Sequence, residues 1–98
     1  MALEIVWTKR AIAGFDNIIE YLEKNFTDKE VKRFVKQSAE FFELLKHYPE
    51  MLEKTEEQEH VFRGPINKYT ILTYRIVKKT NQIQLINIRS ARRKPLKG

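Results

Sequence analysis

The sequence contains no cysteine, which excludes a disulfide framework, a cysteine-ligated zinc site and a thiol nucleophile. Its two histidines, His47 and His60, are too few to indicate a metal site. We expect neither a metal nor another cofactor. Only three glycines and three prolines occur in 98 residues, which argues against a disordered or linker-like chain.

Long apolar runs are also missing. No segment approaches the ~18 apolar residues that indicate a membrane-spanning helix, and the first residues, MALEIVW, carry no basic leader. We therefore expect a cytoplasmic protein without membrane contact. Because single domains commonly have about 100–150 residues, the sequence predicts one domain over residues 1–98, with enough apolar residues (42%) for a core.

Carboxylates are missing from the last two fifths of the chain. Residues 60–98 hold ten Lys or Arg and no Asp or Glu, whereas residues 1–59 hold nine and thirteen, giving formal charges of +10 and −4. A field of one sign raises the local concentration of polyanions or acidic protein surfaces, so we expect the function in the basic part. The alternative is that these cations only solubilise strand edges and prevent aggregation.

The first half of the chain shows one strand pattern followed by a helix pattern. Leu3, Ile5 and Trp7 alternate with other residues, which predicts a short strand over residues 3–7. Thr8 is a plausible N-cap for the helix that follows. Helical spacing relates Ala11, Phe15, Ile18, Ile19, Leu22 and Phe26. Gly14 within this stripe costs about 1 kcal/mol relative to Ala.

A second helix is indicated by a capping box, in which Thr27 and Glu30 exchange hydrogen bonds between side chain and backbone. Its apolar stripe consists of Val31, Phe34, Val35, Ser38, Phe41, Phe42, Leu45 and Tyr48. Pro49 marks its end. Only Asn25-Phe26 separates the two helices, so we expect an antiparallel hairpin whose aromatic stripe is core.

Residues 50–59 carry five glutamates and are predicted to form a solvated loop. Close carboxylates can act as acid and base where burial separates their pKa values, and a solvated loop offers no such burial. Residues 61–63 then predict a short strand that Gly64-Pro65 breaks.

Two longer strands are predicted over residues 69–77 and 82–89, joined by a polar turn. One face of the first consists of Thr70, Leu72, Tyr74 and Ile76. Adjacent Leu85 and Ile86 break the alternation of the second, as in a bulged strand or one covered on both faces. The order βααβββ predicts an α+β fold: an N-terminal strand, the helical hairpin, then a three-strand antiparallel meander with both helices on one face.

Several short motifs occur in a fixed order along the chain. They are Trp7-Thr8-x-x-Ala11, Phe15-x-x-Ile18-x-x-Tyr21-Leu22, Tyr48-Pro49, Ile66-Asn67-Lys68-Tyr69, Tyr74-Arg75-Ile76 and Arg92-x-x-Pro95. In this order the chain resembles the RelE/ParE superfamily of bacterial type II toxins over nearly its whole length. The closing R-x-x-P is similar to the ending of many ParE-like members.

This resemblance implies a growth-inhibiting toxin, of a kind known for plasmid stabilisation, that a cognate antitoxin neutralises. We expect that partner to carry an acidic tail, partly disordered when free. ParE-like members imply action on DNA gyrase, whereas RelE-like members imply ribosome-dependent, metal-independent cleavage of mRNA, assisted by a Tyr or His near the C-terminus. Residues 93–98 contain neither, which favours gyrase. A small basic nucleic-acid-binding module is the third alternative, and whether the protein is an enzyme stays open.

Six cations are candidates for contacts with the target: Arg63, Lys68, Arg75, Arg89, Arg92 and Arg93. Strand alternation spreads them over both sheet faces and the strand ends, so they cannot all meet one target. Arg92 and Arg93 are the strongest candidates because they belong to the closing motif, whereas Arg75 alternatively pairs with Glu40 or Glu43. No catalytic residue is assigned. Groups available for a proton-transfer step are Glu59, His60, Tyr69 and Tyr74, the last of which we expect in the core.

Overall fold

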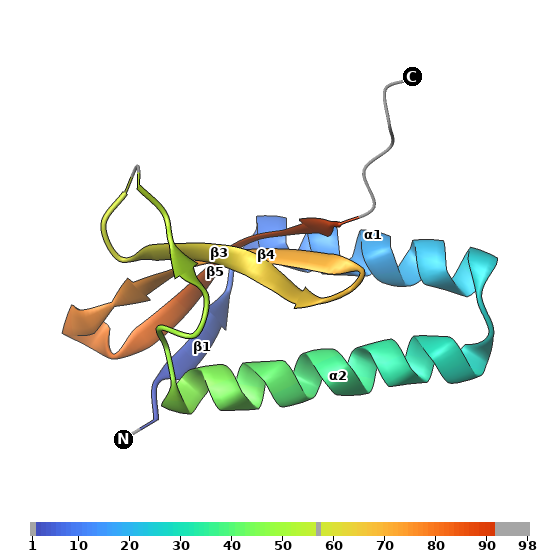
Figure 1. The fold of residues 1–98 in the computed structure, drawn as a ribbon, viewed down its shortest axis with the longest axis horizontal. Helices are drawn as coiled ribbons and strands as arrows, with labels where there is room; N and C mark the ends of the chain where they lie inside the picture. Colours follow the sequence, from blue (N-terminus) through green and yellow to red (C-terminus); the bar gives the residue numbers. More distant parts are fainter. Residues whose placement is uncertain (1, 57, 92–98) are drawn as a thin grey trace.

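The computed structural model describes residues 2–56 and 58–91 (Figure 1). Its elements are β1 (Glu4–Trp7), α1 (Lys9–Asn25), α2 (Asp28–His47), β2 (Glu53–Lys54), β3 (Val61–Asn67), β4 (Thr70–Val77), the 3-10 helix η1 (Lys78–Thr80) and β5 (Gln82–Ser90). The strands form one five-stranded sheet in the order β1-β5-β4-β3-β2. β1 pairs with β5 in parallel, and the other neighbours are antiparallel. The predicted α+β fold is confirmed.

Both helices begin where the sequence predicts. The Oγ1 atom of Thr8 accepts a hydrogen bond from the Ala11 amide at 3.1 Å, which caps α1. Thr27 and Glu30 form the complete capping box of α2. These bonds satisfy amides that the first turn of a helix leaves without an intrahelical partner. The helices end at Asn25 and His47, before Pro49.

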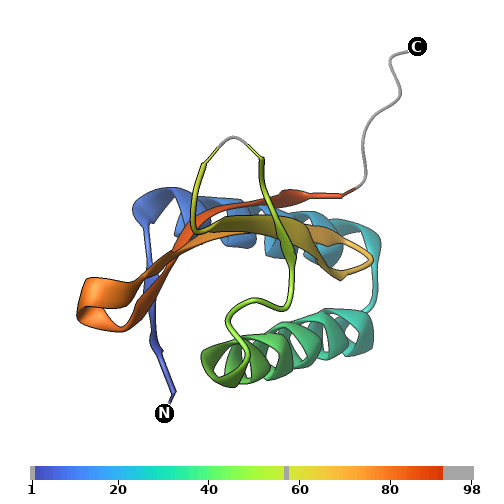
Figure 2. The ribbon, with the colours of Figure 1, turned by 60° about the vertical axis from the view of Figure 1, so that its left-hand side comes forward.

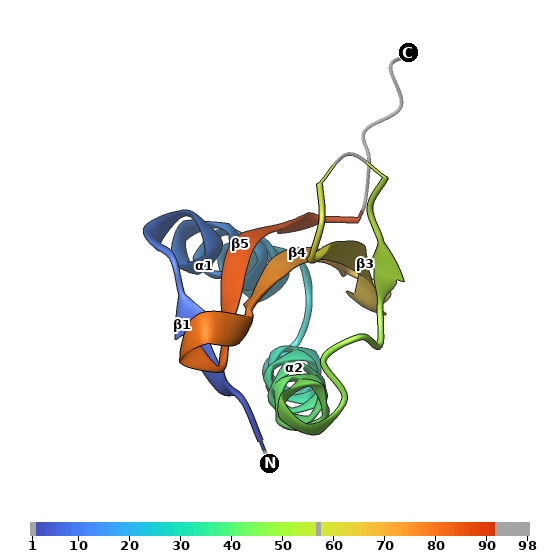
Figure 3. The ribbon, with the colours of Figure 1, turned by 90° about the vertical axis from the view of Figure 1, so that its left-hand side faces the viewer.

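The core lies between the helices and one face of the sheet. Alternate residues of β4 are buried, as the pattern predicts, and its other residues are half-buried or exposed. The fully buried side chains include Tyr74, Leu72, Ile83, Leu85, Phe34 and Leu45. Figure 3 shows α2 beneath the sheet, with the β2–β3 loop rising on the opposite side. The sheet thus has one face covered by helices and a second face open to solvent.

A bulge in β5 explains the break in its alternation. Thr73 pairs with Asn87 and Tyr74 with Leu85, which leaves Ile86 as an extra residue. The extra residue shifts the parity of the strand, so that Leu85 and Ile88 both point into the core. The sequence alternatives of a bulge and of a strand covered on both faces are therefore resolved in favour of a bulge.

The expected break at Gly64-Pro65 is wrong, because β3 continues through it to Asn67. Pro65 pairs with Ile71 of β4, whereas β2 pairs only with Phe62 and Arg63. β3 is therefore a free edge at Pro65, and a missing N–H is tolerated there. The short β2 also lies inside the segment expected to be a loop. The β3–β4 turn lies at the end of the sheet nearest the α1–α2 connection (Figure 2).

α1 lies directly on the backbone of β5. A Cβ atom built on Gly14 would come within 1.8 Å of the Ile88 carbonyl oxygen, closer than any side chain tolerates. Glycine has a low helix propensity, but it is needed at position 14 because the side chain of any other residue would clash with the β5 backbone.

The first prediction concerns Gly14→Ala. Helix propensity alone predicts a gain of about 1 kcal/mol, but the clash with β5 should instead lower the free energy of unfolding by about 2 kcal/mol or more. Urea unfolding followed by circular dichroism measures this change. The matched control is Ala13→Gly at an exposed position of the same helix, with an expected loss of about 1 kcal/mol. A more stable Gly14→Ala protein would contradict the close approach.

Candidate functional site

The open face of the sheet, on the side away from α2, carries two of the predicted cations side by side. Arg63 on β3 stands opposite Thr73, and Arg75 on β4 stands opposite Val61, so the two arginines are diagonal neighbours. Arg10, from the first turn of α1, joins them at a depression of about 360 Å³. We call Arg10, Arg63 and Arg75 the arginine cluster.

Among the described residues, no carboxylate forms an ion pair within 4 Å with the arginine cluster, although Arg63 also lines a neighbouring depression with Glu53 and Glu56. No Asp or Glu lines the depression. The only ion pair within 4 Å in residues 2–56 and 58–91 joins Lys46 to Glu43 near the end of α2, away from the depression. The alternative that Arg75 pairs with Glu40 or Glu43 is wrong, because β4 presents Arg75 on the face opposite α2.

Polar side chains complete the lining of the depression. Thr73 and Asn87 pair across β4 and β5, are half-buried, and have no side-chain hydrogen bond to another described residue. Thr55 and Gln58 contribute from the β2–β3 loop, where the Thr55 hydroxyl donates to the Gln58 carbonyl at 3.2 Å. The depression therefore offers hydrogen-bond donors of three side-chain types and a positive field.

Arg10 was not among the candidates from the sequence. It lies in the acidic part of the chain, and its place depends on the parallel pairing of β1 with β5. That pairing brings the start of α1 to the bulge in β5, where Ile86 also lines the depression. No local pattern in the sequence announces this contact, because the two segments are more than 70 residues apart.

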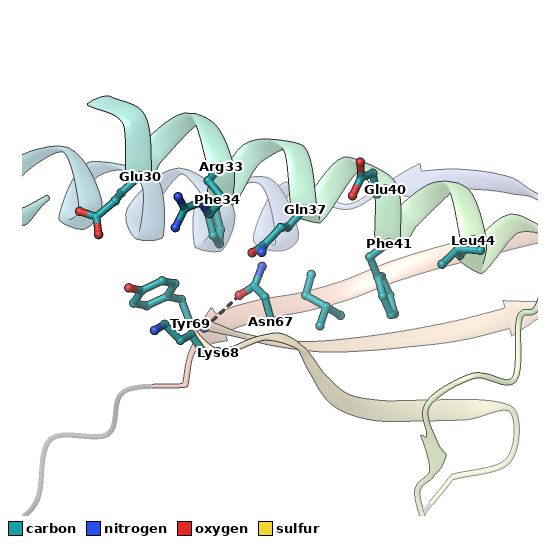
Figure 4. Close-up of a pocket in the computed structure, with 11 residues that line it drawn as sticks. Glu30, Arg33, Phe34, Gln37, Glu40, Phe41, Leu44, Asn67, Lys68 and Tyr69 are labelled. Carbon is teal, nitrogen blue, oxygen red and sulfur yellow. Dashed lines mark hydrogen bonds between the residues drawn. The ribbon is translucent and has the colours of Figure 1, made fainter. Parts of the chain in front are cut away.

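Lys68 lies elsewhere, at the β3–β4 turn. It lines a groove of about 610 Å³ between this turn and α2, where Figure 4 shows it beside Tyr69 and across from Glu30 and Arg33. Its Nζ atom stands 5.6 Å from the centre of the Tyr69 ring, a distance at which a cation and a ring attract. Two carboxylates, Glu30 and Glu40, and two cations, Arg33 and Lys68, line the groove. Their charges balance, so the groove lacks the one-signed field of the open face.

The turn beside the groove is held by Asn67. Its Oδ1 atom accepts from the Tyr69 amide at 2.9 Å, and its Nδ2 atom donates to the Ser38 hydroxyl of α2 at 3.3 Å. The bond to Ser38 ties the turn to α2 at this end of the groove, and Figure 4 shows Asn67 between Tyr69 and the helix.

Arg89 occupies a third place, near the end of β5. It lines a cavity of about 310 Å³ between α1 and β5, together with Asn17, Tyr21 and Tyr69. Arg92 and Arg93, the strongest candidates from the sequence, lie outside the described residues. Of the four predicted cations that the structure describes, it thus brings together Arg63 and Arg75, whereas Lys68 and Arg89 lie apart.

Tyr74 is a core residue, as expected. Its hydroxyl donates to the Pro49 carbonyl at 2.7 Å, and its ring stacks on Phe62 at 5.3 Å between centroids. Burial raises the pKa of Tyr74 to about 12, although the Leu52 amide, which donates to its oxygen, opposes this rise. A neutral hydroxyl in the core has no access to a ligand on the open face.

The other groups considered for proton transfer also lie away from the depression. Tyr69 is half-buried, with Phe26 at 5.7 Å and Phe34 at 6.4 Å between ring centroids. Glu59 and His60 are exposed in the β2–β3 loop, and neither lines the depression. In the described part of the chain, no three metal-ligating side chains come together. Within the same ranges, no helix is both long and apolar enough to cross a bilayer.

Comparison with known proteins gives one family and several similar folds. The family model of the ParE toxin of type II toxin-antitoxin systems, parDE, matches residues 5–95. No curated protein sequence matches the chain.

Solved structures of toxin-antitoxin proteins have the same fold. A chain of the chromosomal ParDE system from P. aeruginosa is 16% identical, with a TM-score of 0.73, covering 93% of this chain and 98% of its own. A chain of the RelBE2 complex from Mycobacterium tuberculosis is 14% identical, with a TM-score of 0.62 and coverage of 92% and 99%. The isolated E. coli RelE toxin is 13% identical, with a TM-score of 0.58 and coverage of 97% and 90%. At these identities the likeness concerns the fold alone.

The second prediction concerns Tyr74→Phe, which removes the hydroxyl and keeps the ring on Phe62. The Pro49 carbonyl loses its donor, so the free energy of unfolding should fall by about 1–2 kcal/mol at pH 7. In the native protein the raised pKa disfavours the charged hydroxyl, so the contribution of Tyr74 is complete below pH 10 and decreases as pH rises towards 12.

The measurement is urea unfolding of both proteins at pH 7, 9, 10 and 11. The difference between them should shrink above pH 10. A difference that stays constant up to pH 11 would show that the Tyr74 hydroxyl is solvated and not buried as described.

Proposed function

Because the chain belongs to the ParE toxin family of type II toxin-antitoxin systems, we propose that it arrests bacterial growth by acting on DNA gyrase. The family match over residues 5–95 carries this proposal. The higher TM-score to the ParDE chain than to the RelE chains is a property of the fold and agrees with the same branch.

The lining of the open face supports gyrase over the alternative of mRNA cleavage on the ribosome. Cleavage of RNA by its own 2′-hydroxyl needs cations at the phosphate and a positioned group that moves a proton. The depression supplies Arg10, Arg63 and Arg75, but no described residue of its lining is a His, Tyr, Asp, Glu or Lys. Its chemistry fits binding of an anion better than proton transfer.

The partner in this proposal is a cognate antitoxin with an acidic tail, acting with the toxin in the cytoplasm. The arginine cluster attracts such a tail. Half-buried Ile71 and Val77 share the open face of β4 with Arg75, and half-buried Ile86 lines the depression. They offer apolar area to a segment that folds on binding. Burial of that area offsets the ordering of the tail.

The third prediction is growth arrest. Induced without a partner in a bacterial host, the protein should lower viable counts, and co-expression of the neighbour-encoded antitoxin should restore them. Arg92→Ala or Arg93→Ala should reduce toxicity, whereas Lys97→Ala, which removes an equal charge from the same segment, should not. Normal growth at confirmed folded expression removes the toxin proposal. If Arg92→Ala and Arg93→Ala are both as toxic as the unmodified protein, the target contacts lie elsewhere.

The fourth prediction separates the two targets. Purified protein should inhibit supercoiling of relaxed plasmid by gyrase, or provoke gyrase-dependent DNA breaks, and should leave mRNA intact on translating ribosomes. Both assays use one preparation, with the antitoxin-bound protein as the inactive control. Codon-phased mRNA cleavage that Arg92→Ala abolishes would overturn the gyrase proposal in favour of the endonuclease.

A further inference from the structure

We propose that the arginine cluster is a binding site for phosphate groups, with Arg10, Arg63 and Arg75 as its cationic ligands. The proposal deepens the proposed function by naming the chemistry that the open face recognises, but the site is defined by its own geometry. The three arginines come from α1, β3 and β4 and line one depression. Their convergence is a property of the tertiary structure.

The arginines are free to bind an external anion. All three are exposed, and none has an ion pair or a side-chain hydrogen bond to another described residue. Each guanidinium carries five N–H donors in a planar fork that matches the oxygens of phosphate. Three like charges in one depression repel one another, so a bound anion lowers their mutual repulsion as well as satisfying their donors.

The number of donors favours phosphate over a single carboxylate. A carboxylate has two oxygens, which one guanidinium fork satisfies, whereas a phosphate, or two successive phosphates of a backbone, presents more acceptors. Thr73 and Asn87 add a hydroxyl and an amide between the arginines. The chain's own acidic segment is adjacent, with Glu53 opposite Arg63 in the register of β2 and β3. No ion pair within 4 Å nevertheless joins these two residues.

The lining of the depression also predicts that the site does not recognise the bases of a nucleic acid. No aromatic side chain lines the depression, so no described residue there provides a platform on which a base can stack. Binding to a nucleic acid should therefore depend on its phosphates and not on its sequence. It should also weaken steeply with salt, because bound arginines release counterions from the backbone.

The test uses the full chain and four probes in a phosphate-free buffer of low ionic strength. The probes are inorganic phosphate, pyrophosphate, a 12-nucleotide single-stranded DNA of mixed sequence and a 12-residue glutamate peptide. Amide chemical shifts locate each probe, and calorimetry measures each Kd. Expected are shift changes at β3, β4 and the first turn of α1, and tighter binding of pyrophosphate than of phosphate.

The variants are Arg10→Gln, Arg63→Gln and Arg75→Gln, all at exposed positions. Each should weaken phosphate and DNA binding about tenfold, as expected for loss of one charge-assisted hydrogen bond, and should reduce the salt slope for DNA by about 1. The matched control is Arg33→Gln on exposed α2, which removes the same charge and should change binding less than twofold. Native circular dichroism spectra confirm folding.

Each outcome either supports or overturns the proposal, and the supporting outcomes also identify the source of the bound phosphate. Binding of all phosphate probes identifies a nucleic-acid backbone as a competent source, and binding of phosphate and pyrophosphate alone identifies a small phosphorylated ligand. Equal losses in Arg33→Gln and the cluster variants, shift changes elsewhere, no binding of any phosphate probe, or tighter binding of the glutamate peptide than of every phosphate probe overturns the proposal. These measurements do not use gyrase or growth, so failure of the phosphate site and failure of the proposed toxin activity are separately visible.

Discussion

The contact of α1 with β5 is the constraint on which the rest of the structure depends. Thr8 caps the helix and also donates from its Oγ1 atom to the Leu85 carbonyl at 2.7 Å, so one hydroxyl joins the helix start to the sheet. Further along the helix, Gly14 lets its backbone lie against the Ile88 carbonyl. These two points fix the direction of α1 along β5, and the short connection to α2 then places the second helix over the core.

The same contact builds the basic surface. Because β1 lies parallel to β5, the chain leaves β1 at the bulge of β5, and the first turn of α1 brings Arg10 beside the strands that carry Arg63 and Arg75. The bulge at Ile86 keeps Leu85 and Ile88 in the core on either side of it. A fold requirement, burial of both residues, thus determines which side chains remain on the open face.

Acidic and basic residues are concentrated in different segments of this chain. Apart from Glu4 on β1, the carboxylates lie on the helices and in the segment around β2, whereas the charged residues of β3, β4 and β5 are all cations. The core uses the apolar face of these strands, and the cations take positions on the open face, at the turns and at the strand ends. The basic surface therefore requires no charged residue in the core. Its arginines repel one another, and binding of an anionic partner relieves this repulsion.

Local patterns in the sequence determined the helices, their caps, the strands of the basic part and the burial of Tyr74, because helical spacing and alternation express which side of an element meets the core. They also indicated the irregularity at Leu85 and Ile86. The passage of β3 through Pro65 was decided by tertiary structure, since it depends on how far β2 extends as a neighbour. The grouping of Arg10 with Arg63 and Arg75, and the separation of Lys68 and Arg89 from them, were decided in the same way. Which cations share a surface depends on the pairing of strands that are far apart in the sequence, and no local period records that pairing.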